Sequence, residues 1–202
     1  MITINKEYVE KQIINKSEFI CTLIPITDSN DASIKLSEIR KKYYDATHNC
    51  YAYIYGYDGE NVRFSDDGEP SQTAGVVILD CLKKNNLTNV LAVVTRYFGG
   101  IKLGASGLVR AYSSTTALCV KTIAPLHLTT CVYMELNVSY NTFNKISRLL
   151  LAYSEQNKSF NDDIYLKYLI PFSEKETLNK KLIELTKGQI SITFSEPVSL
   201  FL

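Results

Sequence analysis

The stretch RYFGGIKLGASGLVRAY, residues 96–112, is the part of the sequence that most directly suggests a binding site. It contains the glycines Gly99, Gly100, Gly104 and Gly107 and the cations Arg96, Lys102 and Arg110. Ser106 lies in the first turn of the expected helix. A glycine-rich loop between a strand and a helix leaves free backbone N–H groups at the positive end of the helix dipole, and these attract anions. The stretch therefore predicts an anion-binding site. The alternative is a tight turn that only packs the helix closely against the sheet.

The same stretch departs from the common nucleotide-binding motifs. A Walker loop has Lys and then Ser or Thr directly after its last glycine, whereas Gly104 is followed by Ala105 and Ser106. The spacing G-x-G-x-x-G is absent, and no acid lies at the expected distance, because none occurs before Glu135. We therefore expect contact with a polyanion or a partner rather than with a small nucleotide, and no cofactor.

Charge is unevenly distributed, although the formal net charge is only +1. Residues 81–134 contain no Asp or Glu, and their six cations are Lys83, Lys84, Arg96, Lys102, Arg110 and Lys121. Such a segment favours contact with nucleic acid. Alternatively, acids are scarce here because most of the segment is buried strand and helix.

A second polar group consists of His48, Cys50, Asp66, Asp67 and Glu69. Carboxylates and an imidazole can hold a divalent cation or act as acid and base, and His48 beside Cys50 suggests a thiol–imidazole pair. The simpler interpretation is structural: Asp and Gly form a turn, and Pro70 and Ser71 open a helix that acids stabilise. We expect no metal site here and keep a small hydrolase or metal-dependent enzyme as the alternative function.

Four tyrosines alternate along the preceding strand, at Tyr51, Tyr53, Tyr55 and Tyr57. The opposite face carries Cys50, Ala52 and Ile54 and suits a surface packed beneath helices. An open tyrosine face would stack nucleic-acid bases, with Tyr53 among the stacking residues. The alternative is that tyrosine, which favours strands, fills a second core.

The hydrophobic pattern predicts an α+β protein of two domains, residues 1–125 and 130–202. In the first, the Asp58-Gly59 turn joins two strands in a hairpin, and the apolar run 90–94 predicts a central strand covered on both faces. A helix is expected over about residues 104–122. The second follows the order β-α-β-β-α-β of ferredoxin-like folds, with EQNKSFNDD contributing a short strand at most.

Bulk composition is that of a soluble globular protein, with 46% hydrophobic and 21% charged residues. No apolar run is long enough to cross a bilayer, and the charged N-terminus lacks the apolar core of a signal peptide. The five cysteines are scattered and never spaced as C-x-x-C, which predicts reduced thiols rather than disulfides or zinc. We expect a cytoplasmic protein without membrane contact.

Three blocks in this order, HNCYAY, SDDGEPSQTAG and VVTRYFGGIKLGASGLVRAY, resemble the Impact family of the bacterial YigZ/YvyE type, over about residues 15–125. The resemblance implies a first domain like the second domain of ribosomal protein S5, and a tail similar to the last domain of elongation factor G. Gln72 and Ser106 stand where the family usually has glycine. Eukaryotic relatives act in translational control through an added N-terminal domain, so their partner is not carried over to this chain.

Together these observations predict a non-enzymatic binding protein linked to translation regulation. It would contact RNA or the ribosome through the cationic, glycine-rich strand, loop and helix of residues 96–112. The alternatives are the small enzyme described above and a protein-interaction adaptor in which the tyrosine face meets a polypeptide. A common open groove for Arg96, Lys102 and Arg110 would favour the binding protein, and a pocket shared by His48 and the acids would favour the enzyme.

Overall fold

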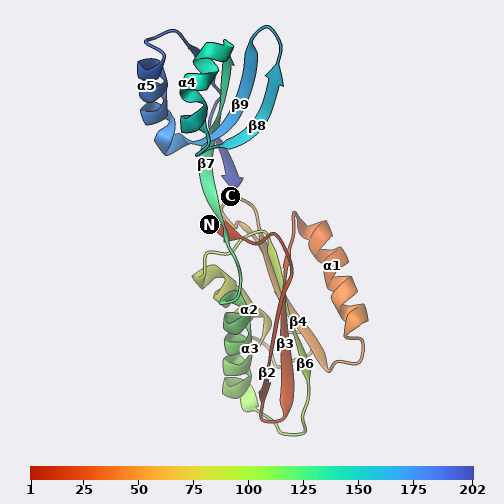
Figure 1. The fold of residues 1–202 in the computed structure, drawn as a ribbon. Helices are drawn as coiled ribbons and strands as arrows, with labels where there is room; N and C mark the ends of the chain where they lie inside the picture. The colour runs from red at the N-terminus through yellow and green to blue at the C-terminus, as the bar shows by residue number, and fades with distance from the viewer. The chain divides into compact units, whose positions relative to one another are not determined.

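The computed structural model describes residues 1–202 and confirms the α+β class (Figure 1). The chain forms two compact units, Met1–Leu128 and Thr129–Leu202, which are described separately below. No helix in the chain combines the length and the apolar character needed to cross a membrane.

The first unit contains one antiparallel sheet of five strands and three helices. The strands, in sheet order, are β2 (Tyr8–Ile14), β3 (Ser17–Pro25), β6 (Val90–Tyr97), β4 (His48–Tyr55) and β5 (Asn61–Ser65). The helices are α1 (Ser29–Lys42), α2 (Gly75–Lys84) and α3 (Gly104–Val120). A short strand, β1 (Ile2–Thr3), pairs with Leu126 and His127, which still belong to this unit and begin the strand β7 (Leu126–Val138).

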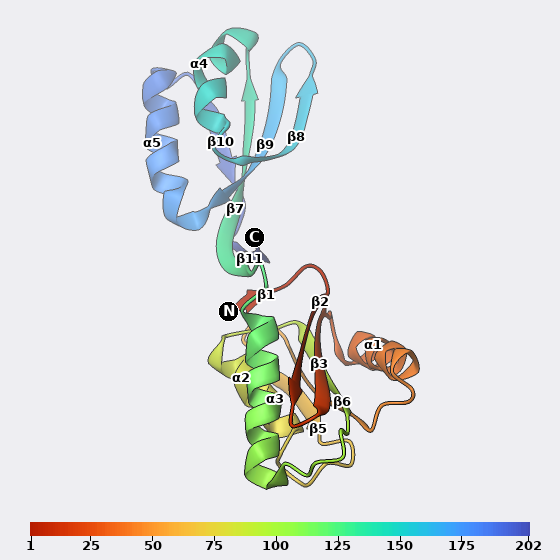
Figure 2. The same cartoon turned by 60° about the horizontal axis from the view of Figure 1, so that its bottom comes forward.

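Helices cover both faces of this sheet: α2 and α3 lie on one face and α1 on the other (Figures 1 and 2). The central strand β6 is accordingly buried on both sides, and residues 90–94 are fully buried, as predicted. Beneath α3, the ring of Tyr112 meets the ring of Phe19 edge-on, with 5.3 Å between centroids. Burial of such rings contributes much of the stability of a core.

The tyrosine face of β4 is a second core, and the prediction of a base-stacking platform is wrong. Tyr51 and Tyr53 are only 8% and 7% exposed, because α1 packs over them with Ala32, Leu36 and Ile39. Tyr53 therefore offers no ring face to a base. Tyr51 and Tyr53 are equally closed to a protein partner, whereas Tyr57, beyond the end of β4, is 59% exposed.

No strand was predicted for residues 8–14, yet they form β2, which makes a hairpin with β3. Asn15 and Lys16 make the two-residue turn, with φ values of 47° and 63°. Positive φ at both central positions is the signature of the hairpin turn whose twist matches its strands. Half-buried and exposed residues alternate along β2, as expected of an edge strand with one face toward solvent, although Val9 and Ile13 on the exposed face are apolar.

The second unit follows the predicted element order. Its elements are β7 (Leu126–Val138), α4 (Tyr140–Leu150), β8 (Ser154–Phe160), β9 (Ile164–Pro171), a 3-10 turn (Phe172–Glu174), α5 (Lys175–Leu185), β10 (Ser191–Phe194) and β11 (Val198–Phe201). The antiparallel order β10-β7-β9-β8 buries one face of the sheet with residues of α4 and α5. β8 is a full strand of seven residues, which its exposed polar sequence concealed, and β11 adds a further pairing with β7.

Candidate anion-binding pocket

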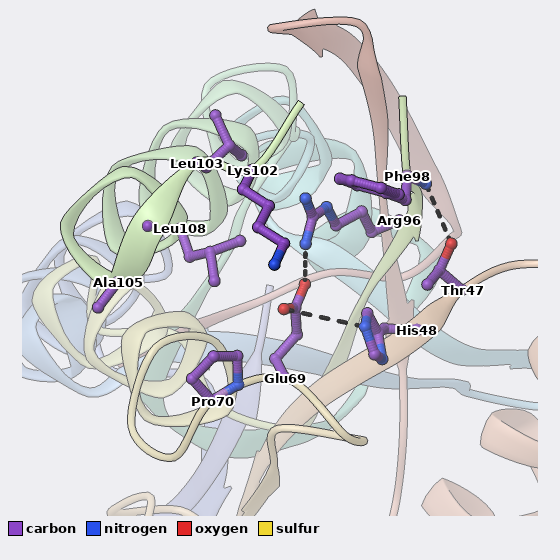
Figure 3. Close-up of a pocket in the computed structure, with 11 residues that line it drawn as sticks. Thr47, His48, Glu69, Pro70, Arg96, Phe98, Lys102, Leu103, Ala105 and Leu108 are labelled. Carbon is purple, nitrogen blue, oxygen red and sulfur yellow. Dashed lines mark hydrogen bonds and ion pairs between the residues drawn. The ribbon is translucent and has the colours of Figure 1, made fainter. Parts of the chain in front are cut away.

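A pocket of about 440 Å³ lies beside the beginning of α3, at the end of the sheet where β4 starts and β6 finishes. Figure 3 shows that it combines the two polar groups that the sequence had presented as alternatives. Arg96 and Lys102 belong to the glycine-rich stretch, whereas His48 and Glu69 belong to the acidic group, and all four line the pocket. The pocket is therefore neither the purely cationic groove nor the cluster of His48, Cys50 and acids that the sequence suggested.

Strand register explains why His48 and Arg96 lie together. They are directly opposed in the pairing of β4 with β6, and Phe19 on β3 is the next partner of Arg96. Directly opposed residues of an antiparallel pair project from the same face of a sheet. Here that face is the one covered by α2 and α3, whose core includes Phe19. The sheet therefore fixes one edge of the pocket before any loop contributes to it.

Arg96 and Glu69 form a buried ion pair at the base of the pocket. Arg96 Nη1 donates to Glu69 Oε1 at 2.7 Å, and the two side chains are 6% and 3% exposed. The Tyr112 hydroxyl donates to the same oxygen, also at 2.7 Å, and burial raises the pKa of this hydroxyl so that it stays a donor. Arg96 is thus not an exposed cation flanking the glycines, which corrects the expected set of three.

One buried polar atom at this base lacks a hydrogen-bond partner, and one carboxylate oxygen accepts no hydrogen bond from a side chain. Arg96 Nε is buried and unpartnered. Both hydrogen bonds that Glu69 accepts from side chains end on Oε1, while Oε2 lies 3.9 Å from His48 Nε2, beyond hydrogen-bond distance. Buried polar groups are almost always satisfied, so the unpartnered Arg96 Nε marks a place where a bound molecule would be stabilised.

His48 presents one ring nitrogen to the pocket and uses the other for support. Its Nδ1 lies 2.8 Å from the carbonyl oxygen of Asp67. Because a carbonyl only accepts, Nδ1 must carry the proton, and Nε2 of the neutral ring is then an acceptor.

The rim of the pocket is the first turn of α3 together with Lys102. The N-cap residue, Leu103, offers no side-chain acceptor to the first N–H groups, and Gly104 has a φ of +69° with open space around it. In Figure 3 Lys102 extends toward Arg96 and Glu69. It takes part in none of the ion pairs of the chain. An uncapped helix start beside an unpaired ammonium group is a favourable place for an anion.

Arg110 lies outside this pocket, in a smaller hollow of about 230 Å³ that also includes Gly107. Leu103 lines both hollows, so Arg110 and Lys102 are on either side of this one residue. Ser106 is exposed on the first turn and lines neither hollow. The two free cations of the stretch therefore lie in neighbouring hollows rather than in a single groove.

The glycines of the stretch divide between two roles. A Cβ on Gly99 would lie 1.9 Å from the carbonyl oxygen of Lys16, so this glycine allows the loop to approach the β2–β3 turn. Gly100 and Gly104 have positive φ and nothing near the position of a Cβ, so they shape the loop rather than its packing. Close packing and an accessible helix start are thus both present.

Asp66 has a structural role at the beginning of α2. That helix starts at Gly75 and not near Pro70 and Ser71, because residues 66–74 form turns. The Asp66 carboxylate accepts from the N–H groups of Gln72, Ala74 and Gly75 at 2.9, 3.0 and 2.8 Å. It therefore replaces the missing cap, since Ala74 has no side-chain acceptor.

Asp67 and Cys50 are likewise held in structural contacts. Asp67 pairs with Arg40 at 2.8 Å and accepts from the N–H of Asn49 at 2.7 Å. The Cys50 thiol donates to the carbonyl oxygen of Asp66 at 2.9 Å, and burial raises its pKa to about 12, so it is a poor nucleophile. No group of three or more His, Cys, Asp or Glu side chains is arranged to hold a metal ion.

Comparison with known proteins identifies relatives over most of the chain. Residues 15–120 match the family described as the Impact N-terminal domain. The IMPACT family member YvyE of Bacillus subtilis is 38% identical, over 95% of this chain and 89% of that protein. The IMPACT family member YigZ of Escherichia coli is 31% identical, over 89% of this chain and 90% of that protein. Human Protein IMPACT is 38% identical over 44% of this chain and 29% of its own length. A crystal structure of a hypothetical protein covers 95% of both chains with a TM-score of 0.60 and 28% identity.

Proposed function

Because the chain belongs to the Impact family, we propose that it is a non-enzymatic protein of translation regulation that contacts RNA or the ribosome through the start of α3. The observation that carries this proposal is the uncapped first turn of α3 with Lys102 and Arg110 on either side of Leu103. Phosphate groups are anions of the size and charge that such a turn attracts. A strand crossing the turn would meet both cations.

The link to translation rests on the resemblance of the two parts of the chain to domains of ribosome-associated proteins. The family resemblance implies that the first unit is like the second domain of ribosomal protein S5 and that the tail is like the last domain of elongation factor G. A cytoplasmic location accompanies this proposal, because ribosomes are there. The partner of the eukaryotic relatives is not transferred, since human Protein IMPACT is matched over only 29% of its length.

The attraction to RNA comes from two cations rather than from the whole acid-free segment. Glu69, which precedes that segment, already neutralises Arg96. Two neutralised phosphates on a single strand imply a log–log salt slope of about −1.4. Binding is then weak, sequence-tolerant and only moderately salt-dependent.

Fluorescence anisotropy with a labelled single-stranded RNA, across a salt series, tests the proposal. The double variant Lys102→Ala/Arg110→Ala should bind more weakly and with a flatter slope. The matched control is Lys83→Ala/Lys121→Ala, which removes two exposed cations of the same segment outside both hollows. If Lys102→Ala/Arg110→Ala binds RNA with the same affinity as the wild type, the proposal is refuted. Sedimentation with ribosomes at two salt concentrations extends the same comparison to the whole particle.

One observation favours a second candidate, a small hydrolase. His48 Nε2 faces Glu69 in the pocket while the Asp67 carbonyl orients the ring, an arrangement suited to a general base. Of the original polar group only His48 and Glu69 line the pocket, and a metal-dependent version has too few ligands there. Turnover of a phosphodiester by highly purified protein, lost in His48→Gln, would favour the hydrolase over the binding protein.

A further inference from the structure

We infer that the pocket at the start of α3 binds the terminal nucleotide of an RNA strand that carries a phosphomonoester, rather than an internal nucleotide. This inference rests on the proposed function, because it specifies which part of an RNA the same surface takes. Three properties of the pocket carry it: a cationic rim, an apolar wall, and a base with an unsatisfied buried donor. Each corresponds to one part of a nucleotide.

The rim fits the phosphate. The first N–H groups of α3 have no side-chain cap, and Lys102 has no carboxylate partner. Within the pocket the charges of Arg96 and Glu69 cancel, so Lys102 and the helix dipole leave an excess of positive charge. A phosphomonoester carries about −1.5 to −2 at neutral pH, whereas an internal phosphodiester carries one charge. The rim therefore favours a chain end that bears a phosphate.

The wall fits a base. Phe98, Leu103 and Leu108 line the pocket with apolar surface. Phe98 is 46% exposed, and the Arg96 guanidinium lies 5.4 Å from the centroid of its ring. A large aromatic ring left open at the rim of a pocket, with a cation behind it, is a favourable stacking surface for a base.

The base of the pocket fits a sugar or base edge. Arg96 is only 5% exposed, and its Nε has no acceptor, while Glu69 Oε2 accepts no hydrogen bond from a side chain. A ribose hydroxyl both donates and accepts, so a single such group can satisfy a free donor or a free acceptor. The unsatisfied Arg96 Nε is independent of the helix start and points to the same ligand.

Size selects a chain end over an internal position. A volume of about 440 Å³ lies within the range of about 300–1,000 Å³ that is typical of small-molecule sites. A single nucleotide suits a site of this volume. An internal nucleotide would require two exits for the backbone.

The test compares three versions of one labelled RNA: 5′-phosphorylated, 3′-phosphorylated and unphosphorylated. The wild type should bind one phosphorylated form about tenfold more tightly, and AMP should compete with that form. The form preferred identifies the end. Phe98→Ala should abolish the preference while leaving the salt-dependent binding of the unphosphorylated strand. Val109→Ala is the matched control, because it truncates an exposed apolar residue of α3 outside the pocket.

The outcomes separate this inference from the proposal beneath it. Equal affinity for all three RNAs, with weaker binding by Lys102→Ala/Arg110→Ala, overturns the terminal-nucleotide inference and leaves RNA contact intact. Equal affinity of that double variant and the wild type for unphosphorylated RNA overturns the proposed function instead. A preference for phosphorylated RNA that Phe98→Ala does not change also overturns the inference, because the base would then have no part in it. Circular dichroism confirms that each variant is folded.

Discussion

Replacing Glu69 with alanine should strongly destabilise the first unit. Glu69 Oε1 accepts from both Arg96 and Tyr112, and the side chains of Glu69 and Arg96 are almost fully buried. Glu69→Ala removes the counter-charge of the guanidinium and the acceptor of the phenol at once. The remaining cation then lies at the end of the sheet, with Ser17 Oγ at 3.4 Å as its only weak acceptor among side chains.

The magnitude follows from the burial of the pair. Breaking a buried ion pair by removing one partner costs about 3–5 kcal/mol, because a charge stays buried without compensation. The unsatisfied Tyr112 hydroxyl adds to this within the same network, so the two losses are not summed. We expect a loss of about 4 kcal/mol. Glu69→Gln keeps an acceptor and removes only the charge, so its loss should be about 1–3 kcal/mol.

Urea unfolding followed by circular dichroism measures these differences. Because the chain has two compact units, the transition of the first unit must be identified. Ile146→Ala serves this purpose, since Ile146 is fully buried in the core of the second unit and should lower only the other transition. A double variant, Glu69→Leu/Arg96→Met, should recover part of the loss, because apolar side chains of similar volume replace a buried pair at little cost.

Two results would refute this reasoning. A loss below about 1 kcal/mol for Glu69→Ala would mean that solvent or a rearranged side chain compensates Arg96, as at an exposed pair. A double variant less stable than Glu69→Ala would mean that Arg96 contributes more by packing against Phe19 and Phe98 than the charge accounts for.

Three further predictions concern residues that the sequence had offered as functional. Asp66→Ala should lower the free energy of unfolding by about 1–2 kcal/mol through loss of the cap of α2, while Asp66→Asn retains most of it. Cys50 should not react with a disulfide reagent at pH 8 until urea unfolds the protein, because the thiol is buried and its pKa is about 12; rapid reaction in the native state would contradict its burial. Tyr53→Ala should cost about 3 kcal/mol in urea unfolding and leave RNA affinity unchanged, whereas a loss of affinity at unchanged stability would restore the stacking interpretation.

Periodicity predicted the regular parts of the fold well. The apolar run 90–94 is the central strand, and the spacing of Ile146 and Leu150 gives the buried face of α4. β2 and β8 were missed or shortened because edge strands expose most of their side chains, so alternation is weak there. The start of α2 was misplaced because its cap, Asp66, comes from nine residues before Gly75 and not from the adjacent position.

The candidate site was harder to predict because its parts are distant in sequence. The glycine-rich stretch and the acidic turn were both identified, but not that Glu69 reaches across to Arg96, 27 residues away. Side chains alternate between the two faces along β4 and β6. If the pairing register had been known, this alternation would have placed His48 and Arg96 on the same face of the sheet. Tyr51 and Tyr53 are buried because α1 covers them, and the composition of β4 alone does not reveal that a helix packs there.

Glu69 also allows stability to be separated from binding. If the pair with Arg96 is only structural, Glu69→Gln should weaken RNA binding or leave it unchanged, in step with any loss of structure. If the pocket binds a phosphate as inferred, removing one negative charge leaves Lys102, Arg96 and the start of α3 without an opposing carboxylate. The affinity for phosphorylated RNA should then rise at low salt, although the protein becomes less stable, and the gain should shrink as salt screens the charges. Opposite changes in stability and affinity from one substitution would be difficult to explain without an anion bound in this pocket. If Glu69→Gln lowers both the stability and the affinity for RNA, Glu69 has a structural role only.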